Sequence, residues 1–522
     1  MSGKQTPLTL RAWQGGPVLA GPDEAPPPLP RFGAPDRAPF GAVGLADPAP
    51  PPAASEAAPE EDAAHRTGEG ARAVYDLSTT EPVPFVSSLV HHRVDDDHLW
   101  IAVEDGKLLV ADDLDHELLT LLVAGTTPAD AARELHRTRG LAPDAATRAM
   151  AKLVGRVALA GMIRGIRGNH SIKKIRPHRF ARFHLTNRCQ LQCVHCYTSS
   201  SPFLPKDGEL STERWIRLVE DFAANGGEKL LLTGGEALVH EGCIPVMRRA
   251  HELGLEVTLF SNGMAVPKHL DDLARYADIV QISVDGPTAE IHDAIRGRHS
   301  FRRATRAIRL LLDAGVQTQV STTIMMNNWA AIKAGLPAFI DEWRDSDVKF
   351  RISYGAMAHG RGTDLDHDLN EDEVRDWVDE LLGGLRIGDD KAHGPNKVQK
   401  INSCGYAEQL VVASDGIVYP CHLLSGALGH IDQLPLSEIT DYLKRTSDAF
   451  TVDNRKGCQS CDLRNLCGGT CRVEDEKHTG SRLITTCTPE EKLRRRRFLV
   501  RRYRPVPGAA PEVGSEVGPG SS

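Results

Sequence analysis

The sequence predicts an α/β fold built on a partial (βα)6 barrel, with a winged-helix-like module before the barrel and a cysteine-rich domain after it. Three observations favour this architecture. Strand-like and helix-like stretches alternate from residue 178 to about 385, which is the pattern of a parallel sheet. Two short strands and three helical stretches precede that region. A stretch with little periodicity but many cysteines follows it, from 386 to 492.

Composition excludes several classes of protein. The chain has 522 residues, enough for several domains, and its net charge of −8 does not favour binding to nucleic acid or to an anionic membrane. Its mean hydropathy is −0.30, and no apolar run approaches the ~20 residues of a membrane helix. The N-terminus has no secretory signal pattern, so we expect a cytoplasmic protein. Eleven cysteines in that compartment indicate metal ligation rather than disulfides.

The two ends of the chain have the composition of disordered segments. Residues 1–72 are rich in Pro and Ala, and residues 505–522 are rich in Pro, Gly and Ser. Such segments bury too little apolar surface to offset the entropy lost on ordering. A basic stretch, Lys492–Arg504, precedes the second tail, and we interpret it as a solvated helix face rather than a binding surface for RNA or an acidic peptide.

Residues 75–168 predict a small separate module. Leu99–Val103 and Lys107–Ala111 have strand patterns and are joined by a Glu-Asp-Gly hairpin turn. Three helical periods follow, with Thr127 as a cap of the second, at Asp115–Leu122, Pro128–Arg137 and Pro143–Ala160. The order resembles that of the peptide-binding chaperone domain of pathways for ribosomally made, modified peptides. The resemblance implies that a leader peptide adds as a strand to the edge of the hairpin; a purely structural extension is the alternative.

The barrel region, residues 178–385, contains six predicted strand–helix units. The strands are expected to start at Phe183, Lys229, Glu256, Ile279, Thr318 and Lys349. The helices are expected at Ser211–Ala224, Cys243–Leu253, Pro267–Tyr276, Phe301–Ala314, Asn328–Trp343 and Asn370–Leu382. Six units make an incomplete, TIM-like barrel, whose chemistry is expected at the C-terminal ends of the strands.

Three cysteines follow the first of these strands. Cys189, Cys193 and Cys196 are separated by three and two residues. Three thiolates can hold three corners of a cubane iron–sulfur cluster and leave the fourth iron without a protein ligand. A tetrahedral zinc site is the alternative; it would need a fourth ligand, and His195 lies within the loop itself.

This triplet, with Tyr197 behind it, resembles the signature of the radical S-adenosylmethionine superfamily. Residues at the later strand ends resemble the family in the same order: Gly234, Gly235 and Glu236, then Asn262, then Ser283 and Arg296. The resemblance implies that these six residues contact S-adenosylmethionine, which binds the open iron of a [4Fe-4S] cluster held by the triplet. Glycines allow close backbone approach, and a glutamate accepts hydrogen bonds from an ammonium group. The family usually has Pro after the Glu, where this chain has Ala237.

A second set of seven cysteines lies in the C-terminal region. Its members are Cys404, Cys421, Cys458, Cys461, Cys467, Cys471 and Cys487. Their spacing resembles that of the SPASM domain, and two zinc sites are the alternative reading. The resemblance implies two auxiliary iron–sulfur clusters, of which the outer is held by Cys458, Cys461, Cys467 and Cys487. The other three cysteines would hold the inner cluster.

The inner cluster lacks one thiolate in this chain. Some relatives have a further cysteine where this sequence has Val398. The inner cluster therefore either keeps an open iron or takes a non-cysteine ligand such as His393 or Asn402. Cys243 falls outside both patterns, and we expect it to be a buried small hydrophobe.

Together these resemblances imply an enzyme, a radical S-adenosylmethionine oxidoreductase that modifies peptides. The expected reaction begins with a 5′-deoxyadenosyl radical and installs a carbon–carbon or carbon–heteroatom cross-link in a ribosomal precursor peptide. A reductant such as flavodoxin or ferredoxin would supply the electron. Formylglycine formation, as in sulfatase-maturating enzymes, and peptide epimerisation are the alternatives among enzymes. A binding protein with degenerate chemistry is disfavoured by the intact triplet and Glu236.

Overall fold

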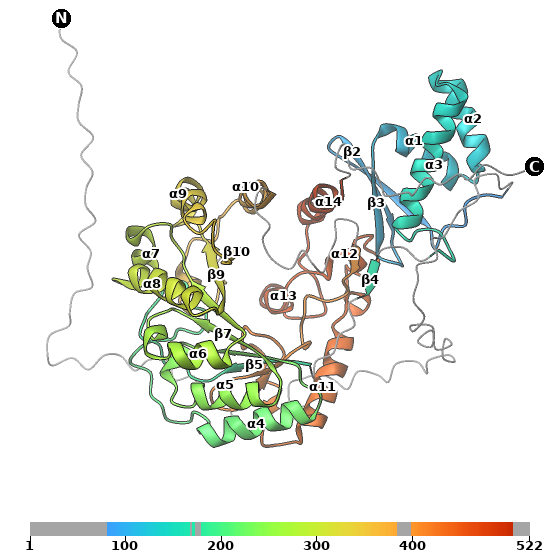
Figure 1. The fold of residues 1–522 in the computed structure, drawn as a ribbon. Coiled ribbons are helices and arrows are strands. Elements are labelled where there is room, and N and C mark those ends of the chain that lie inside the picture. Colours follow the sequence, from blue (N-terminus) through green and yellow to red (C-terminus); the bar gives the residue numbers. More distant parts are fainter. Residues whose placement is uncertain (1–80, 167–169, 173–178, 356, 384–397, 505–522) are drawn as a thin grey trace, which may run out of the picture.

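The computed structural model describes residues 81–166, 170–172, 179–355, 357–383 and 398–504. The two tails for which we predicted disorder lie outside the described residues, as does His393. Figure 1 shows a curved central sheet with helices along its outer side, and a small N-terminal module at one end of the molecule. Among the described residues, no helix is both long and apolar enough to cross a lipid bilayer.

Six parallel strands form the barrel, and their order in space is their order in the chain. They are β5 (Phe180–His184), β6 (Lys229–Thr233), β7 (Glu256–Ser261), β8 (Ile279–Ser283), β9 (Gln317–Ile324) and β10 (Lys349–Tyr354). Four of the six expected starts match the structure. The starts at Phe183 and Thr318 were wrong, because β5 and β9 begin earlier, where their first residues already pair with β6 and β8.

Helices follow the strands and cover the outer face of the sheet (Figure 1). They are α4 (Thr212–Ala224), α5 (Cys243–Glu252), α6 (Leu270–Tyr276), α7 (Ala289–Arg296), α8 (Ser300–Asp313), α9 (Trp329–Asp341) and α10 (Glu371–Gly383), with 3-10 turns at Ala237–Val239, Val266–Lys268 and Gly360–Asp364. The sequence patterns did not predict α7, which has eight residues and buries only His292 and Ile295. Cys243 is 1% exposed within the barrel core, as expected for a small hydrophobe.

The central sheet continues into the C-terminal region. Strand β12 (Leu410–Val412) pairs in parallel with β5, and β13 (Ile417–Tyr419) and β14 (Gly429–His430) extend the sheet from it. The remaining elements are β4 (His170–Ile172), β11 (Val398–Lys400), α11 (Leu436–Ala449), α12 (Arg464–Cys467), α13 (Arg472–Thr479), α14 (Pro489–Tyr503) and a 3-10 turn at Val452–Asn454. The expected division near residue 385 therefore separates segments that share one sheet.

The N-terminal module is a three-stranded antiparallel sheet covered on one face by three helices. Its elements are β1 (Leu89–Val94), β2 (Asp97–Ala102), β3 (Lys107–Ala111), α1 (Asp113–Val123), α2 (Pro128–Arg139) and α3 (Pro143–Leu159). The predicted hairpin is β2–β3, and Thr127 caps α2 by accepting a hydrogen bond from the Asp130 amide. Strand β1 was not predicted, because its His-His-Arg centre has no apolar alternation.

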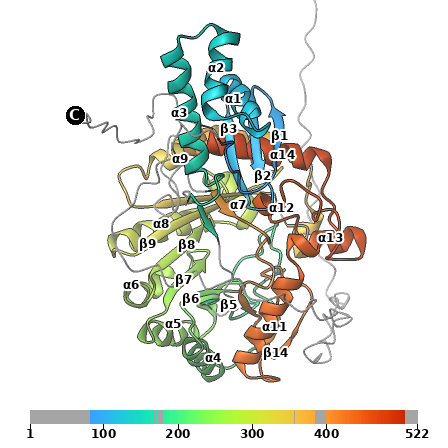
Figure 2. The same ribbon diagram turned by 90° about the vertical axis from the view of Figure 1, so that its right-hand side faces the viewer.

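The other face of this sheet packs on the C-terminal helix α14. Leu499 and Val500 of α14 are buried against Val94, Leu99 and Ile101. Figure 2 places α14 beside β1 and β2, and Figure 1 also places it beside β2. Two arginines of α14 and Arg504 just after it also form ion pairs with three aspartates, Asp462, Asp95 and Asp97. The interpretation of the basic stretch as a solvated face was therefore wrong, because this helix joins the module to the C-terminal region.

Replacing Leu499 by alanine should loosen this junction. Leu499 is 3% exposed, and truncating a buried leucine costs about 2–5 kcal/mol. We expect faster hydrogen exchange in β1–β3, measured by mass spectrometry. The matched control is Leu493→Ala on the same helix, where the side chain is 39% exposed and the effect should be small. Equal exchange in the two variants would contradict the packing role of Leu499.

Candidate functional site

The loop after β5 brings three cysteines together at the C-terminal end of that strand. Cys189 and Cys193 are buried, and Cys196 is partly exposed. Burial, with smaller contributions from the neighbouring Glu236, Cys193 and Cys196, raises the pKa of Cys189 to about 12. Each thiolate raises the pKa of the thiols beside it, so clustered thiols ionise readily only when a cation binds next to them. The donor set fits an iron–sulfur cluster, which binds thiolates in this number and leaves an open position.

Contacts from distant segments hold this loop in place. The Val194 amide donates to the Ile295 carbonyl at 3.0 Å, and the Cys189 amide donates to the Ser201 carbonyl at 3.1 Å. Arg361, which lies after β10, donates through Nε to the Cys193 carbonyl at 2.9 Å. The cysteine loop is thus tied to α7 and to the segment after β10.

Gly234 and Gly235 lie where the end of β6 approaches the end of β5. A Cβ on Gly234 would lie 2.3 Å from the Thr186 carbonyl oxygen, and one on Gly235 would lie 2.4 Å from that of Arg188. The Gly235 amide donates to Thr186 at 2.7 Å. Only glycine fits so close to a backbone. Both residues are therefore required for packing against the cysteine loop, whether or not they also approach a ligand.

Glu236 is a buried carboxylate at the same edge of the sheet. It is 1% exposed and accepts hydrogen bonds from the Asn262 amide at 2.8 Å and from Ser261 Oγ at 3.0 Å. Burial raises its pKa to about 7, although these hydrogen bonds oppose the shift. Ala237, where the family usually has Pro, begins the 3-10 turn that follows. A neighbouring cation would favour the ionised form.

The raised pKa of Glu236 predicts a pH-dependent stability. The group's contribution is complete below its ordinary pKa of about 4.5 and is lost as the pH rises through about 7. We expect the free energy of unfolding of the cofactor-free protein to fall by roughly 3 kcal/mol between pH 4.5 and 8 through this group, at 1.36 kcal/mol per pKa unit. Urea unfolding at several pH values should show that Glu236→Gln removes most of this slope. Glu256→Gln, at a half-buried end of β7, is the control that should keep it.

Asn262 connects Glu236 to the cysteine loop. Its side-chain Nδ2 lies 3.1 Å from Gln190 Oε1 and 3.6 Å from the Cys189 sulfur. Its Oδ1 accepts a hydrogen bond from the Met264 amide at 2.9 Å. Asn262 is therefore fixed on both sides, with its amide nitrogen directed at the cysteine loop.

Arg296 reaches the same loop from the end of α7. Its Nη1 lies 4.0 Å from the Cys193 sulfur, and its Nε donates to Asp285 at 2.5 Å. Asp285 is fully buried and also lies 3.3 Å from Nε2 of His195. The Arg296 guanidinium and then His195 hold the pKa of Asp285 below its usual range, against the effect of burial. Ser283 is half-buried at the last position of β8, at the same edge of the sheet.

Asp285 is a site residue that sequence reasoning missed. Its side chain orients Arg296 and contacts the histidine of the cysteine motif. The available signal was its position directly after a strand of the barrel, where functional side chains gather.

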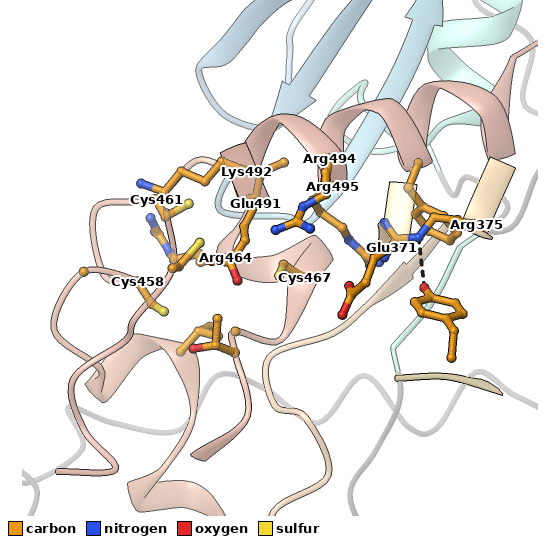
Figure 3. A pocket seen from close by; sticks show the side chains of 18 residues that line it. Glu371, Arg375, Cys458, Cys461, Arg464, Cys467, Glu491, Lys492, Arg494 and Arg495 are labelled. Atoms are coloured by element: carbon orange, nitrogen blue, oxygen red, sulfur yellow. Dashed lines mark hydrogen bonds between the residues drawn. The ribbon is translucent and has the colours of Figure 1, made fainter. Parts of the chain in front are cut away.

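Four C-terminal cysteines line one cavity. Cys458, Cys461, Cys467 and Cys487 surround a space of about 450 Å³ between the cysteine loops and helix α14. Figure 3 shows three of them opposite basic side chains of that helix. The cavity is also lined by Arg464, Lys492, Arg494 and Arg495. Burial raises the pKa of Cys461 and that of Cys487, the latter to about 12, and Lys492 opposes both shifts. A bound metal would favour the thiolate, which is the form that ligates metals.

The other three C-terminal cysteines form a separate group. Burial, with smaller contributions from the nearby Cys471 and Cys404, raises the pKa of Cys421 to about 11. Cys404 acts on Cys471 in the same way. Four of the seven cysteines thus line one cavity and the other three lie near one another, while the assignment of each set to a cluster stays a prediction. Asn402, one suggested extra ligand, is half-buried two residues before Cys404.

A buried ion pair supports the C-terminal cysteines and was not predicted. Arg455 and Asp475 pair with both side chains 0% exposed. Asp475 also accepts from Thr470 Oγ1 at 2.7 Å and from Thr486 Oγ1 at 2.7 Å. The Arg455 guanidinium lies 3.8 Å from the Cys458 sulfur. Because these residues are dispersed in the sequence, no local pattern could have indicated the network.

Comparison with known proteins agrees with this arrangement. Residues 183–328, which span β5 to β9, match the family model of the radical SAM superfamily. The chain is 30% identical to the mycofactocin maturase MftC of Mycobacterium tuberculosis over 55% of this chain and 76% of the relative. It is 31% identical to the sporulation killing factor maturation protein SkfB of Bacillus subtilis, over 49% of this chain and 63% of that protein.

A third relative carries a different name. The chain is 26% identical to the AdoMet-dependent heme synthase of Methanosarcina barkeri, over 58% of this chain and 94% of the relative. The fold, the cysteine motif and these matches together place the chain in the radical SAM superfamily. Its members are enzymes that use a [4Fe-4S] cluster and S-adenosylmethionine, so this chain is an enzyme of that kind.

Proposed function

We propose that the protein is a peptide maturase that installs a carbon–carbon or carbon–heteroatom cross-link in a ribosomally made precursor peptide. The observation that carries this proposal is the arrangement of one cysteine triplet at the barrel's strand ends and a four-cysteine cavity beside a separate N-terminal module. Relatives named as maturation proteins support a peptide substrate.

In this proposal the strand ends of the barrel hold the cofactors. Cys189, Cys193 and Cys196 ligate the [4Fe-4S] cluster, and Glu236 accepts hydrogen bonds from the ammonium group of S-adenosylmethionine. The bound pair supplies a 5′-deoxyadenosyl radical that removes a hydrogen atom from an unactivated carbon. Asp285 keeps Arg296 turned toward Cys193. Leu191 and Met264 pack against the cysteines and exclude water from them.

The C-terminal cysteines hold two auxiliary clusters in this proposal. The four that line the cavity ligate the outer cluster, and Cys404, Cys421 and Cys471 ligate the inner one. The inner cluster keeps a position that no cysteine fills, because Val398 stands where some relatives have one. Held there, the two clusters would supply one-electron redox chemistry, with a flavodoxin or ferredoxin as the external reductant.

The N-terminal module binds the leader part of the precursor peptide in this proposal. Strand β1 pairs with β2, which is therefore the central strand, and the two edges of the three-stranded sheet are β1 and β3. An extended peptide can add to either edge through main-chain hydrogen bonds. On β3, the carbonyl of Val110 already accepts a hydrogen bond from Arg156. On β1, Val90 is 36% exposed.

Photo-crosslinking would identify the edge that is used. A photoreactive phenylalanine is placed at Val90 on β1, at Lys107 on β3, or at Val123 at the end of α1, which is 40% exposed. The precursor peptide should crosslink from one strand edge and not from Val123. Crosslinking from none of these positions, or equally from all three, would argue against addition to this sheet.

The main test measures the mass of a precursor peptide after co-expression with this enzyme. A cross-link lowers the mass by two hydrogens, because the peptide loses one hydrogen atom to the deoxyadenosyl radical and one proton and one electron when the new bond closes. Tandem mass spectrometry should then show a block in fragmentation between the linked residues. An unchanged precursor mass would reject cross-linking while leaving the cofactor assignment intact.

Further measurements on the same peptide separate the alternative reactions. Formylglycine yields an aldehyde, which reacts with a hydrazide reagent, whereas a cross-link does not. Epimerisation leaves the mass unchanged in water and adds one deuterium in heavy water. The heme synthase relative supports a second candidate, tetrapyrrole modification. A change in the absorption spectrum of an added porphyrin, with no change in any peptide, would favour that function.

A further inference from the structure

Three histidines of the N-terminal module converge on one point. His91 of β1, His98 of β2 and His116 of α1 place ring nitrogens within 4.8 Å of one another. His91 Nε2 lies 2.9 Å from His98 Nδ1. The ring centroid of His116 lies 3.8 Å from that of His98 and 4.2 Å from that of His91. Three separate elements of the module thus contribute one imidazole each.

The strand geometry explains how two of these rings meet. His98 shares the helix-facing side of β2 with Trp100, which is opposite His91 in the β1–β2 register. His91 and His98 are therefore diagonal neighbours on one face, where side chains reach one another. If these three positions only filled the core of the module, aliphatic side chains would do so at a smaller desolvation cost than imidazole rings. Nδ1 of His116 is buried and has no hydrogen-bond partner among the described residues.

A carboxylate orients the central ring. Asp113 Oδ1 lies 2.9 Å from His98 Nε2 and accepts its proton in the tautomer that leaves Nδ1 free as a metal ligand; in the other tautomer Nε2 instead accepts from Arg93, which can only donate. Metal-binding histidines commonly donate their second ring nitrogen to a carboxylate in this way. Arg93, half-exposed at the outer side, also approaches the same nitrogen at 2.8 Å and Asp113 at 3.0 Å. Its charge offsets the carboxylate when His98 is neutral.

We propose that His91, His98 and His116 bind a divalent transition-metal ion of the class that prefers imidazole, with Zn²⁺ as the probe. Zinc binds imidazole nitrogen at about 2.0–2.1 Å, so two nitrogens 2.9 Å apart can share one ion. Sites with three protein ligands leave a position for water or another small ligand. A cavity of about 510 Å³, lined by His98, His116 and Glu117, adjoins the site.

The metal would fasten an edge strand to a helix. Among the described residues, β1 pairs in the sheet with β2 alone, and a shared ion would tie it to α1 as well. Successive residues of a strand point to opposite faces. The next residue, His92, pairs on the other face with Asp462, which follows Cys461 of the cysteine-lined cavity. Metal binding by these histidines would not require the proposed peptide substrate.

The test uses the full chain with its iron–sulfur clusters reconstituted, so that the cysteine sites do not take up zinc. One equivalent of Zn²⁺ is added, the protein is desalted, and zinc is counted by mass spectrometry. We expect one zinc per chain, and X-ray absorption at the zinc edge should show nitrogen neighbours with an imidazole pattern and no sulfur.

Matched variants assign the ligands. His116→Phe keeps an aromatic ring in the stack but removes the nitrogen, and His98→Ala removes the central ligand. Each should weaken zinc binding at least tenfold, as judged by competition with a chromophoric chelator. His136→Ala, on α2 of the same module, should bind zinc like the unaltered protein. Zinc retained equally by all three variants, sulfur ligands in the absorption spectrum, or no zinc on the unaltered chain would each overturn the proposal.

Discussion

Replacing Cys196 by alanine should abolish formation of 5′-deoxyadenosine. Cys196 is one of three cysteines in the loop after β5, and a cluster left with two thiolates is not held in place. The iron content of the reconstituted protein should fall by one cluster, about four irons per chain. Losing an outer-shell partner of a metal site lowers metal affinity or activity about 10–100-fold, and losing a ligand should lower it more. We therefore expect the rate of 5′-deoxyadenosine formation to fall by more than about a hundredfold. Chromatography of the reaction with dithionite and S-adenosylmethionine measures the product.

Cys243→Ala is the matched control for this variant. Cys243 is 1% exposed in the barrel core, away from both cysteine groups in the sequence. Removing a small buried sulfur should lower stability by about 1 kcal/mol and leave the iron content and the product unchanged. A Cys196→Ala protein that still formed the product at the rate of this control would refute the assignment of the triplet.

Replacing Asp475 by alanine should strongly destabilise the C-terminal region. The substitution leaves Arg455 charged and unpaired at a position with 0% exposure. Breaking a buried pair in this way costs about 3–5 kcal/mol. Two threonines also lose an acceptor, and the loops that carry Cys458 and Cys487 lose their shared support. Urea unfolding should show the loss of stability, and the reconstituted protein should hold less iron.

Two further variants locate the cause of this effect. Glu474→Ala, one residue earlier, removes a partly exposed pair with Lys477 and should cost at most about 1 kcal/mol. Replacing Arg455 and Asp475 together by leucine should restore part of the lost stability, because no unpaired charge remains. Equal destabilisation by Asp475→Ala and Glu474→Ala would show that the buried pair contributes no more to stability than the partly exposed one.

Local patterns predicted the barrel well because its strands and helices are determined by short-range periodicity. Leu230–Leu232, for example, form a buried apolar run that ends at a glycine pair. Strand β1 could not be predicted in this way. Its polar residues are partly buried through tertiary contacts, with the histidine rings on one face and α14 on the other. The basic character of α14 likewise indicated a solvated helix, since its acidic partners Asp95 and Asp97 lie some 400 residues earlier.

The same distinction applies to the candidate site. The family resemblance implied sets of four and three C-terminal cysteines, and in the structure four of them line one cavity while the other three lie near one another. Which cluster each set would hold stays a prediction. The residues that support them, Asp285 and the Arg455–Asp475 pair, act through contacts between distant segments. Such contacts leave no periodic signal, so only the folded chain reveals them.

The pairing of β12 with β5 also restricts how the enzyme can move. β5 leads into the first cysteine loop, and the β12–β13 hairpin leads into Cys421. Adjacent strands of a sheet cannot slide without breaking their ladder of hydrogen bonds. Because Cys421 follows this hairpin, the pairing fixes its separation from the first cysteine loop. A motion that separated β5 from β12 would have to break their backbone hydrogen bonds.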